Sequence, residues 1–247
     1  MRKISYERSP TVRLDGSMAR VNQQIVGLGG HGSTPVQTRA LMRHVLALTG
    51  KERPRVMHVP TATGDAADGI VAFYERCSGL GDLSHLTFHP WPPRSLRELA
   101  LGQDAISVGG GNTANMLATW HVHGFERILR EAWETGVLLF GASAGMICWF
   151  EAGVTDSFGP ELKGMNDGLR FLAGSACPHY DGEALRRPRY RELVDAGFPE
   201  GIAADDGVGL HYVGTDLHEV VTCRPDAAAY RVARAGEERL EAHLIRR

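Results

Sequence analysis

The sequence has few cysteines, and none of them forms a C-x-x-C pair. The four are Cys77, Cys148, Cys177 and Cys223, and two of them lie inside apolar runs, where a reduced cysteine behaves as a small hydrophobic residue. This usage predicts a reducing compartment and no disulfide framework. Histidines and cysteines also lack the spacing of metal ligands, so we expect no metal site and no cofactor.

Long apolar runs and an excess of charge are missing as well. No uninterrupted apolar run reaches the roughly 18 residues needed to span a bilayer, and the first 20 residues are polar and charged, unlike a signal peptide. The formal net charge of −2 indicates neither nucleic acid nor an anionic membrane as partner. We therefore expect a cytoplasmic protein that binds no nucleic acid and no membrane; a homodimer stays open.

The chain has 247 residues, which suits one large domain. A chain of this length buries enough surface to fold without disulfides. Residues 1–22 look like an N-terminal arm, and no repeat, low-complexity tract or clear linker divides the rest. The predicted organisation is this arm followed by a single α/β domain over residues 23–247.

Strand and helix patterns alternate up to about residue 150. The expected strands are the continuous apolar segments in "QQIVGLGGHGS", "PRVMHVPTAT", "LSHLTFHPW", "AISVGGGN" and "VLLFGASAG". Continuous apolar strands are typical of parallel sheets buried on both faces, so the fold class is α/β, a mostly parallel sheet with helices on both faces. After about residue 150 the alternation weakens, and short strands with antiparallel hairpins are expected at one edge.

Three glycine clusters, Gly27–Gly32, Gly109–Gly111 and Gly141–Gly145, follow predicted strands. Ligands bind beyond the carboxyl ends of parallel strands, so the clusters should converge at one rim. The first cluster, "GLGGHG", matches the dinucleotide fingerprint, but the nearest acid, Asp65, lies well past the end of the second strand. A glycine-rich turn is therefore favoured over a nucleotide-binding module.

The third cluster places Ser143 in G-A-S-A-G directly after a strand. A serine on such a sharp turn exposes its hydroxyl, and its neighbours must be small because backbone atoms crowd there. The N–H of Ala144 would face a developing oxyanion. The backbone N–H groups of Gly110 and Gly111 are candidates for the other half of that oxyanion hole, with a tight strand-to-helix turn as the alternative.

A nucleophilic serine needs a base and an acid. Of the eleven histidines, His179 follows Ser143 in the chain and lies at the end of a predicted strand, in "SACPHYDG". Asp156, in "GVTDSFG", and Asp206, in "AADDGVG", are candidate acids, although turn aspartates often make local hydrogen bonds only.

Four motifs in order, "VGGGNTANML", "LLFGASAGMICWF", "GVTDSFG" and "CPHYDGE", resemble peptidase E, the α-aspartyl dipeptidases, which are related to cyanophycinases. The similarity runs from about Ile106 to about Val221. It implies a fold like class I glutamine amidotransferases. It also implies a serine exopeptidase that removes an N-terminal residue, usually aspartate, from a dipeptide or very short peptide.

By motif, the serine of the peptidase E family falls on Ser143 and its histidine on His179. Its glutamate falls on Asp206, one methylene shorter, and an aspartate also given a relay role falls on Asp156. Asp205 is a substitute for Asp206, so the carboxylate that orients the histidine stays open.

The same resemblance implies which residues bind the substrate. Oxyanion donors are Ala144 with Gly110 or Gly111, and Asn112 is expected beside the substrate. In "EALRRPRYREL", Arg186 is the best match to an arginine associated with acidic substrates, since a guanidinium binds both oxygens of a carboxylate. A solvated basic helix is the alternative for this segment.

A broader serine amidase or esterase of the α/β-hydrolase type is the second enzyme hypothesis. The order Ser143, Asp156, His179 fits that fold. However, only 13 residues separate the first two, which leaves no room for the usual intervening strands and helices.

Overall fold

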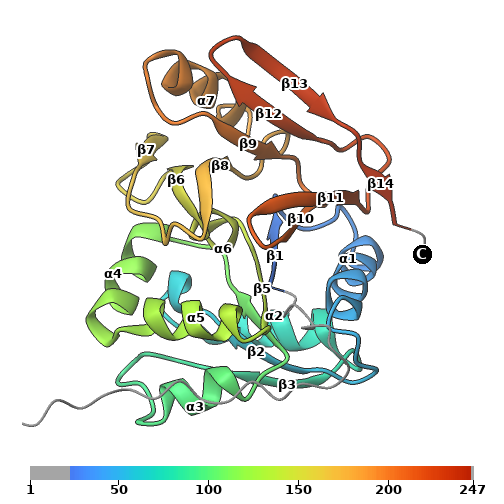
Figure 1. Ribbon diagram of the computed structural model, residues 1–247, viewed down its shortest axis with the longest axis vertical. Helices are drawn as coiled ribbons and strands as arrows, with labels where there is room; N and C mark the ends of the chain where they lie inside the picture. Colours follow the sequence, from blue (N-terminus) through green and yellow to red (C-terminus); the bar gives the residue numbers. More distant parts are fainter. Residues whose placement is uncertain (1–22, 246–247) are drawn as a thin grey trace, which may run out of the picture.

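The computed structural model describes residues 23–245 (Figure 1), and the predicted arm over residues 1–22 lies outside them. The helices are α1 (Pro35–Ala47), α2 (Ala67–Cys77), α3 (Leu96–Leu101), α4 (Thr113–His123), α5 (Phe125–Glu134), α6 (Ala144–Ile147) and α7 (Arg186–Asp195), with a single 3-10 turn, η1 (Thr61–Thr63). None of these helices is long and apolar enough to cross a bilayer, a statement that covers residues 23–245.

Eight strands form the main sheet, in the order β14-β11-β10-β1-β5-β4-β2-β3. They are β1 (Gln24–Leu28), β2 (Arg55–Val59), β3 (Asp82–His85), β4 (Ala105–Val108), β5 (Leu138–Ala142), β10 (Val208–Val213), β11 (Asp216–Thr222) and β14 (His243–Leu244). The five strands from β1 to β3 are parallel, and β10 pairs antiparallel with both β1 and β11. The predicted fold class, a mostly parallel α/β sheet with antiparallel strands from the C-terminal part, is confirmed.

Helices cover both faces of the main sheet, as Figure 1 shows. Successive residues of a strand point to opposite faces, and β1 shows the consequence. Ile25 belongs to the core that includes residues of α4 and α5. Val26 and Leu28 belong to the core that includes residues of α1 and α2. Burial on both faces explains why the parallel strands read as continuous apolar runs.

A second sheet of six strands, in the order β13-β12-β9-β8-β6-β7, lies above the main sheet in Figure 1 together with α7. Its strands are β6 (Phe150–Thr155), β7 (Lys163–Met165), β8 (Leu172–Cys177), β9 (Gly201–Ala204), β12 (Ala229–Ala233) and β13 (Gly236–Leu240). The sequence predicted short late strands but not that most of them form a separate sheet. The chain returns from β9 to β10 of the main sheet through residues 205–207, so this short turn joins the two sheets.

Candidate active site

The nucleophile elbow is present at Ser143, between the end of β5 and the start of α6. Its backbone dihedrals, φ 59° and ψ −116°, lie in a region that costs about 1–3 kcal/mol and is found mainly at functional sites. A Cβ on Gly141 would lie 2.6 Å from the carbonyl oxygen of Gly145, and a Cβ on Gly145 would lie 2.3 Å from that of Val108. Both flanking positions therefore require glycine, for the steric reason that the G-x-S-x-G pattern predicts.

His179 lies just beyond the end of β8, in the second sheet, and also has a positive φ of 54°. Its Nδ1 is 2.6 Å from Oδ1 of Asp206. A carboxylate accepts hydrogen bonds, so this contact assigns the proton to Nδ1 and leaves the Nε2 lone pair free to act as a base. The two side chains are about a quarter exposed, at 22% and 30%, so a substrate can reach them.

Ser143 and His179 flank the same strand end, that of β1. The N–H of Ser143 donates to the carbonyl of Leu28 at 3.2 Å, and the N–H of His179 donates to the carbonyl of Gly29 at 3.0 Å. Adjacent carbonyls of one segment thus hold the backbones of the predicted nucleophile and base. The structure brings together two residues that stand 36 positions apart in the chain.

The glycine turn after β1 makes room for the histidine–aspartate pair. A Cβ on Gly30 would lie 1.8 Å from Oδ1 of Asp206 and 2.9 Å from Nδ1 of His179, and a Cβ on Gly29 would lie 2.3 Å from the carbonyl oxygen of Asp205. The sequence predicted a glycine-rich turn at the rim where the three clusters converge, but not that this turn makes room for His179 and Asp206. The sequence feature that could have indicated this role is the run of glycines at the end of a strand.

The same turn does not resemble a dinucleotide site. Thr34 caps α1 in a capping box with Gln37, and Pro35 occupies the first helical position. The N-terminus of this helix is therefore satisfied by its own side chains, whereas a pyrophosphate site leaves those N–H groups to the ligand. The geometry favours the glycine-rich turn that the sequence analysis preferred.

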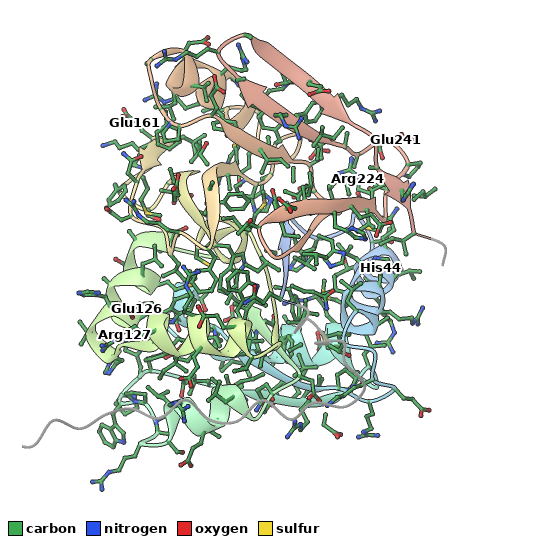
Figure 2. The ribbon with its side chains drawn as sticks, viewed as in Figure 1. His44, Glu126, Arg127, Glu161, Arg224 and Glu241 are labelled. Carbon is green, nitrogen blue, oxygen red and sulfur yellow. The ribbon has the colours of Figure 1, made fainter. Side chains whose placement is uncertain are left out.

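A network around Asp181 and Arg224 holds the backbone of Asp206. The N–H of Asp206 donates to Oδ1 of Asp181 at 2.8 Å. Arg224, which is labelled in Figure 2, donates from Nη1 to the Asp206 carbonyl at 3.1 Å and pairs with Oδ2 of Asp181 at 2.8 Å. Charge-assisted contacts of this kind position the Asp206 carboxylate without touching His179.

The other two candidate carboxylates point elsewhere. Asp205 is 3% exposed and accepts a 2.8 Å hydrogen bond from the N–H of Ala228. Burial raises the pKa of the Asp205 carboxyl to about 6, against the opposing effect of that hydrogen bond. Asp156 is exposed on the turn after β6. The structure therefore places Asp206 on the histidine and leaves Asp156 and Asp205 without a contact to it.

Of the predicted oxyanion donors, Ala144 follows the serine in the chain and Gly110 lies beside it. A Cβ on Gly110 would lie 3.1 Å from Cβ and 3.6 Å from Oγ of Ser143, so this backbone passes directly beside the hydroxyl. Within residues 23–245, no backbone acceptor is bonded to the N–H groups of Gly110, Gly111 or Ala144. Free N–H groups beside a nucleophile are what an oxyanion requires.

Asn112 has a structural role. Its Oδ1 accepts from the N–H of Asn115 at 2.9 Å, which caps α4, and its Nδ2 donates to the carbonyl of Ser157 at 3.0 Å. Each polar end of the side chain makes one of these contacts and keeps capacity for a second, so the expected substrate contact stays a prediction.

Arg186 does not face a substrate site and is a correction to the sequence analysis. The residue is 3% exposed, and its guanidinium donates to a carboxylate oxygen of Glu183 at 2.7 Å and to the carbonyl of Val154 at 2.8 Å. It ties the start of α7 to β6. The sequence analysis predicted that Arg186 binds an acidic substrate, because the arginine-rich segment gives no sign of which arginine turns inward.

A cavity of about 650 Å³ lies between α4, α5 and the segment around β7, and Glu126 and Arg127 on its wall are labelled in Figure 2. None of the predicted catalytic residues lines it. A smaller cavity, of about 40 Å³, lies at the strand ends and is lined by Gly110 and Ala142, next to the elbow. Within residues 23–245, no three His, Cys, Asp or Glu side chains gather as a metal site.

Comparison with known proteins supports the resemblance seen in the motifs. The model of peptidase family S51 matches residues 26–220. The chain is 44% identical over 225 residues to the uncharacterized peptidase YgaJ of Bacillus subtilis (strain 168), a match that covers 90% of this chain and 97% of that protein.

Two solved structures share the fold. A peptidase from an acI-B1 actinobacterium matches with a TM-score of 0.66 and 17% identity, over 90% of this chain and 96% of that one. A putative peptidase E protein from Listeria monocytogenes EGD-e matches with a TM-score of 0.59 and 16% identity, over 89% of this chain and 100% of that one. The predicted resemblance to the peptidase E family is confirmed, and the chain belongs to peptidase family S51.

Proposed function

We propose that this family S51 peptidase is a serine exopeptidase that hydrolyses dipeptides or very short peptides with an N-terminal aspartate. The observation that carries the serine mechanism is the 2.6 Å contact between His179 and Asp206, next to a serine with φ 59°. Nucleophile, base and orienting carboxylate are the parts that acyl transfer needs. The aspartate preference is supported by the motifs shared with peptidase E.

The first half of the reaction forms an acyl-enzyme. Oγ of Ser143 attacks the peptide carbonyl carbon while Nε2 of His179 takes the hydroxyl proton. Asp206 stabilises the resulting imidazolium. The negative oxygen of the tetrahedral intermediate accepts hydrogen bonds from the N–H groups of Ala144 and of Gly110 or Gly111. The C–N bond then breaks, and the imidazolium protonates the leaving amine.

The second half releases the N-terminal residue. His179 removes a proton from a water molecule, which attacks the ester carbonyl of the acyl-enzyme. A second tetrahedral intermediate forms at the same donors and collapses, and the proton returns to Oγ of Ser143. Free amino acid then leaves the site.

The test is cleavage of Asp-Leu and Asp-p-nitroanilide by the wild-type chain and by Ser143→Ala. The alanine variant should lose about 10⁶-fold in kcat, as in other serine hydrolases that lose the nucleophile, with an unchanged circular dichroism spectrum. Ser95→Ala is a matched control, because the Ser95 side chain makes no capping hydrogen bond at α3. Full activity of Ser143→Ala would refute the serine mechanism. Rapid hydrolysis of simple acyl esters without peptide cleavage would favour the broader esterase hypothesis.

A further inference from the structure

Arg76, in the last turn of α2, is a cation that the proposed mechanism does not use. It is half-buried, and within residues 23–245 no carboxylate pairs with it. Its sequence neighbour Glu75 is exposed and acts on it through space only. An arginine stays charged, and leaving a partly buried charge unpaired is costly. This guanidinium is therefore available to an anion from outside the chain.

The small cavity beside the elbow connects Arg76 to the candidate active site. Arg76 and His31 line it together with Gly110, the neighbour of the hydroxyl, and Ala142, which precedes Ser143. No aspartate or glutamate of the described residues lines it. Its volume of about 40 Å³ is close to that of one water molecule in the liquid, about 30 Å³. A single carboxylate group fits a space of this size, and a large side chain does not.

A wider opening leads to the same two side chains. Arg76 and His31 also line an adjoining cavity of about 430 Å³, between the glycine turn and the helices α1 and α2. A short peptide can therefore approach through the larger cavity. One of its groups can then reach the guanidinium while its carbonyl lies near Gly110.

Two imidazoles near Arg76, those of His31 and His58, are neutral at pH 7. Burial of the His31 ring and the positive charge of Arg76 lower the pKa of His31 to about 4, and this residue is also exposed at the cavity mouth. Burial, again with Arg76, lowers the pKa of His58 to about 3. Arg76 thus supplies the positive charge of this cavity, and His31 can add a neutral hydrogen bond.

We propose that Arg76 binds a carboxylate of the peptide substrate in the small cavity. If that carboxylate is the aspartate side chain, Arg76 also determines the preference for acidic substrates. The inference rests on the proposed function and takes the place of the Arg186 assignment, which burial removed. A guanidinium binds both oxygens of a carboxylate in a planar fork, so position and charge are both selected.

Two carboxylates of a substrate such as Asp-Leu have this chemistry: the aspartate side chain and the C-terminal group. Four peptides separate them. Asp-Leu has both carboxylates, Asp-Leu-amide has the side-chain one, Asn-Leu has the C-terminal one, and Asn-Leu-amide has neither.

The experiment is calorimetric binding of the four peptides to the full chain carrying Ser143→Ala, which removes turnover, with and without Arg76→Gln. Arg76→Gln should weaken Asp-Leu binding about tenfold to a hundredfold, as expected for hydrogen bonds between charged groups. Arg76→Lys, which keeps the charge but loses the fork, should be intermediate. Arg127→Gln, an exposed arginine on α5, is the matched control and should bind like the parent.

The pattern of loss identifies the carboxylate. Recognition of the aspartate side chain is supported if Arg76→Gln weakens binding of Asp-Leu and Asp-Leu-amide and leaves Asn-Leu unchanged. Recognition of the C-terminus is supported if it weakens binding of Asp-Leu and Asn-Leu and leaves Asp-Leu-amide unchanged. Equal losses for all four peptides, including Asn-Leu-amide, would mean a structural role and overturn the inference. Unchanged affinity for all four would overturn it as well.

Parallel activity assays separate the two proposals. If the wild-type chain cleaves Asp-Leu, Ser143→Ala does not, and Arg76→Gln equals the wild type in kcat/KM, the serine mechanism stands and the Arg76 inference fails. If Ser143→Ala retains full activity, the mechanism fails, while the binding pattern still decides about Arg76. No detectable binding of any peptide to the Ser143→Ala chain would overturn the Arg76 inference.

Discussion

The two sheets contribute to the candidate active site in different ways. The main sheet supplies the elbow serine and the free N–H groups, on segments where a strand runs directly into a short turn. The second sheet supplies His179 and Asp206 at the ends of β8 and β9, which are parallel neighbours. The first contribution depends on local backbone geometry, and the second depends on how one sheet sits against the other.

This difference indicates which part of the site should tolerate substitutions elsewhere in the fold and which part should be sensitive to them. The elbow is determined by steric contacts within a few residues and the adjacent strand. The histidine–aspartate pair depends on the interface between the two sheets, called the seam here. At this seam the Gly29 carbonyl accepts the His179 N–H, and Gly30 leaves space for the side chains of His179 and Asp206. Substitutions at the seam should therefore lower activity without unfolding either sheet.

The largest effect is expected from removing the base that the second sheet supplies. His179→Ala should lower kcat by about 10⁶-fold, comparable to loss of the nucleophile, because the members of such a unit act together. The donors and cavity of the main sheet remain, so Asp-Leu binding measured by calorimetry should change little. A variant that loses binding along with turnover would mean that the second sheet also holds the substrate.

Asp206→Asn should lower kcat by about 10⁴-fold, since an amide facing Nδ1 favours the wrong histidine tautomer. The measurement is kcat with Asp-p-nitroanilide across a pH series. Asp156→Asn is the matched control, because Asp156 is exposed and makes no contact with His179. A greater loss for Asp156→Asn than for Asp206→Asn would transfer the orienting role to Asp156.

Gly30→Ala tests the seam itself. The added methyl would overlap Oδ1 of Asp206, so the pair must move, and misplacement by about 1 Å costs on the order of 10²-fold in rate. Gly69→Ala is the control, because a Cβ there would lie 3.6 Å from Oγ1 of Thr63, an ordinary van der Waals contact. If Gly30→Ala keeps wild-type kcat/KM with an intact thermal transition, the close packing at the seam is unimportant for catalysis.

The smallest effect on activity is expected at Asp205, beside Asp206. Asp205→Asn should change kcat/KM by less than about threefold. The amide oxygen of asparagine can still accept the hydrogen bond from the Ala228 N–H, and His179 is not involved. Asp205 should instead influence stability. Its pKa is raised from 3.8 to about 6 in the folded chain, so between these values the native state binds more protons than the unfolded state.

The contribution of Asp205 to the free energy of unfolding therefore falls as the pH rises from about 4 to 6. The decrease is roughly 3 kcal/mol at most. Urea unfolding of both proteins at pH 4, 5, 6 and 7 measures it. The wild-type chain should lose stability relative to Asp205→Asn over this range. Parallel pH curves for the two proteins would contradict the raised pKa.

The sequence predicted the parts of the site that depend on nearby residues. Ser143, its flanking glycines and the N–H of Ala144 follow from one short pattern after an apolar strand. The donors at Gly110 or Gly111 follow from a second glycine cluster at another strand end. His179 was reached from its place at a strand end and from the peptidase E motifs. The choice among Asp156, Asp205 and Asp206 stayed open, because all three lie in turn-like sequence and their directions depend on distant strands.

The amino-acid sequence by itself determined the alternating strands and helices, the elbow and the family, because these depend on periodicity, on small residues at crowded positions and on motif order. The tertiary structure alone decided which aspartate contacts His179, that Arg186 is buried, and that Arg76 lines a cavity beside the elbow. Those outcomes depend on the packing of a second sheet and of α2 against the strand ends. Such packing joins residues far apart in the chain, and no local pattern records it.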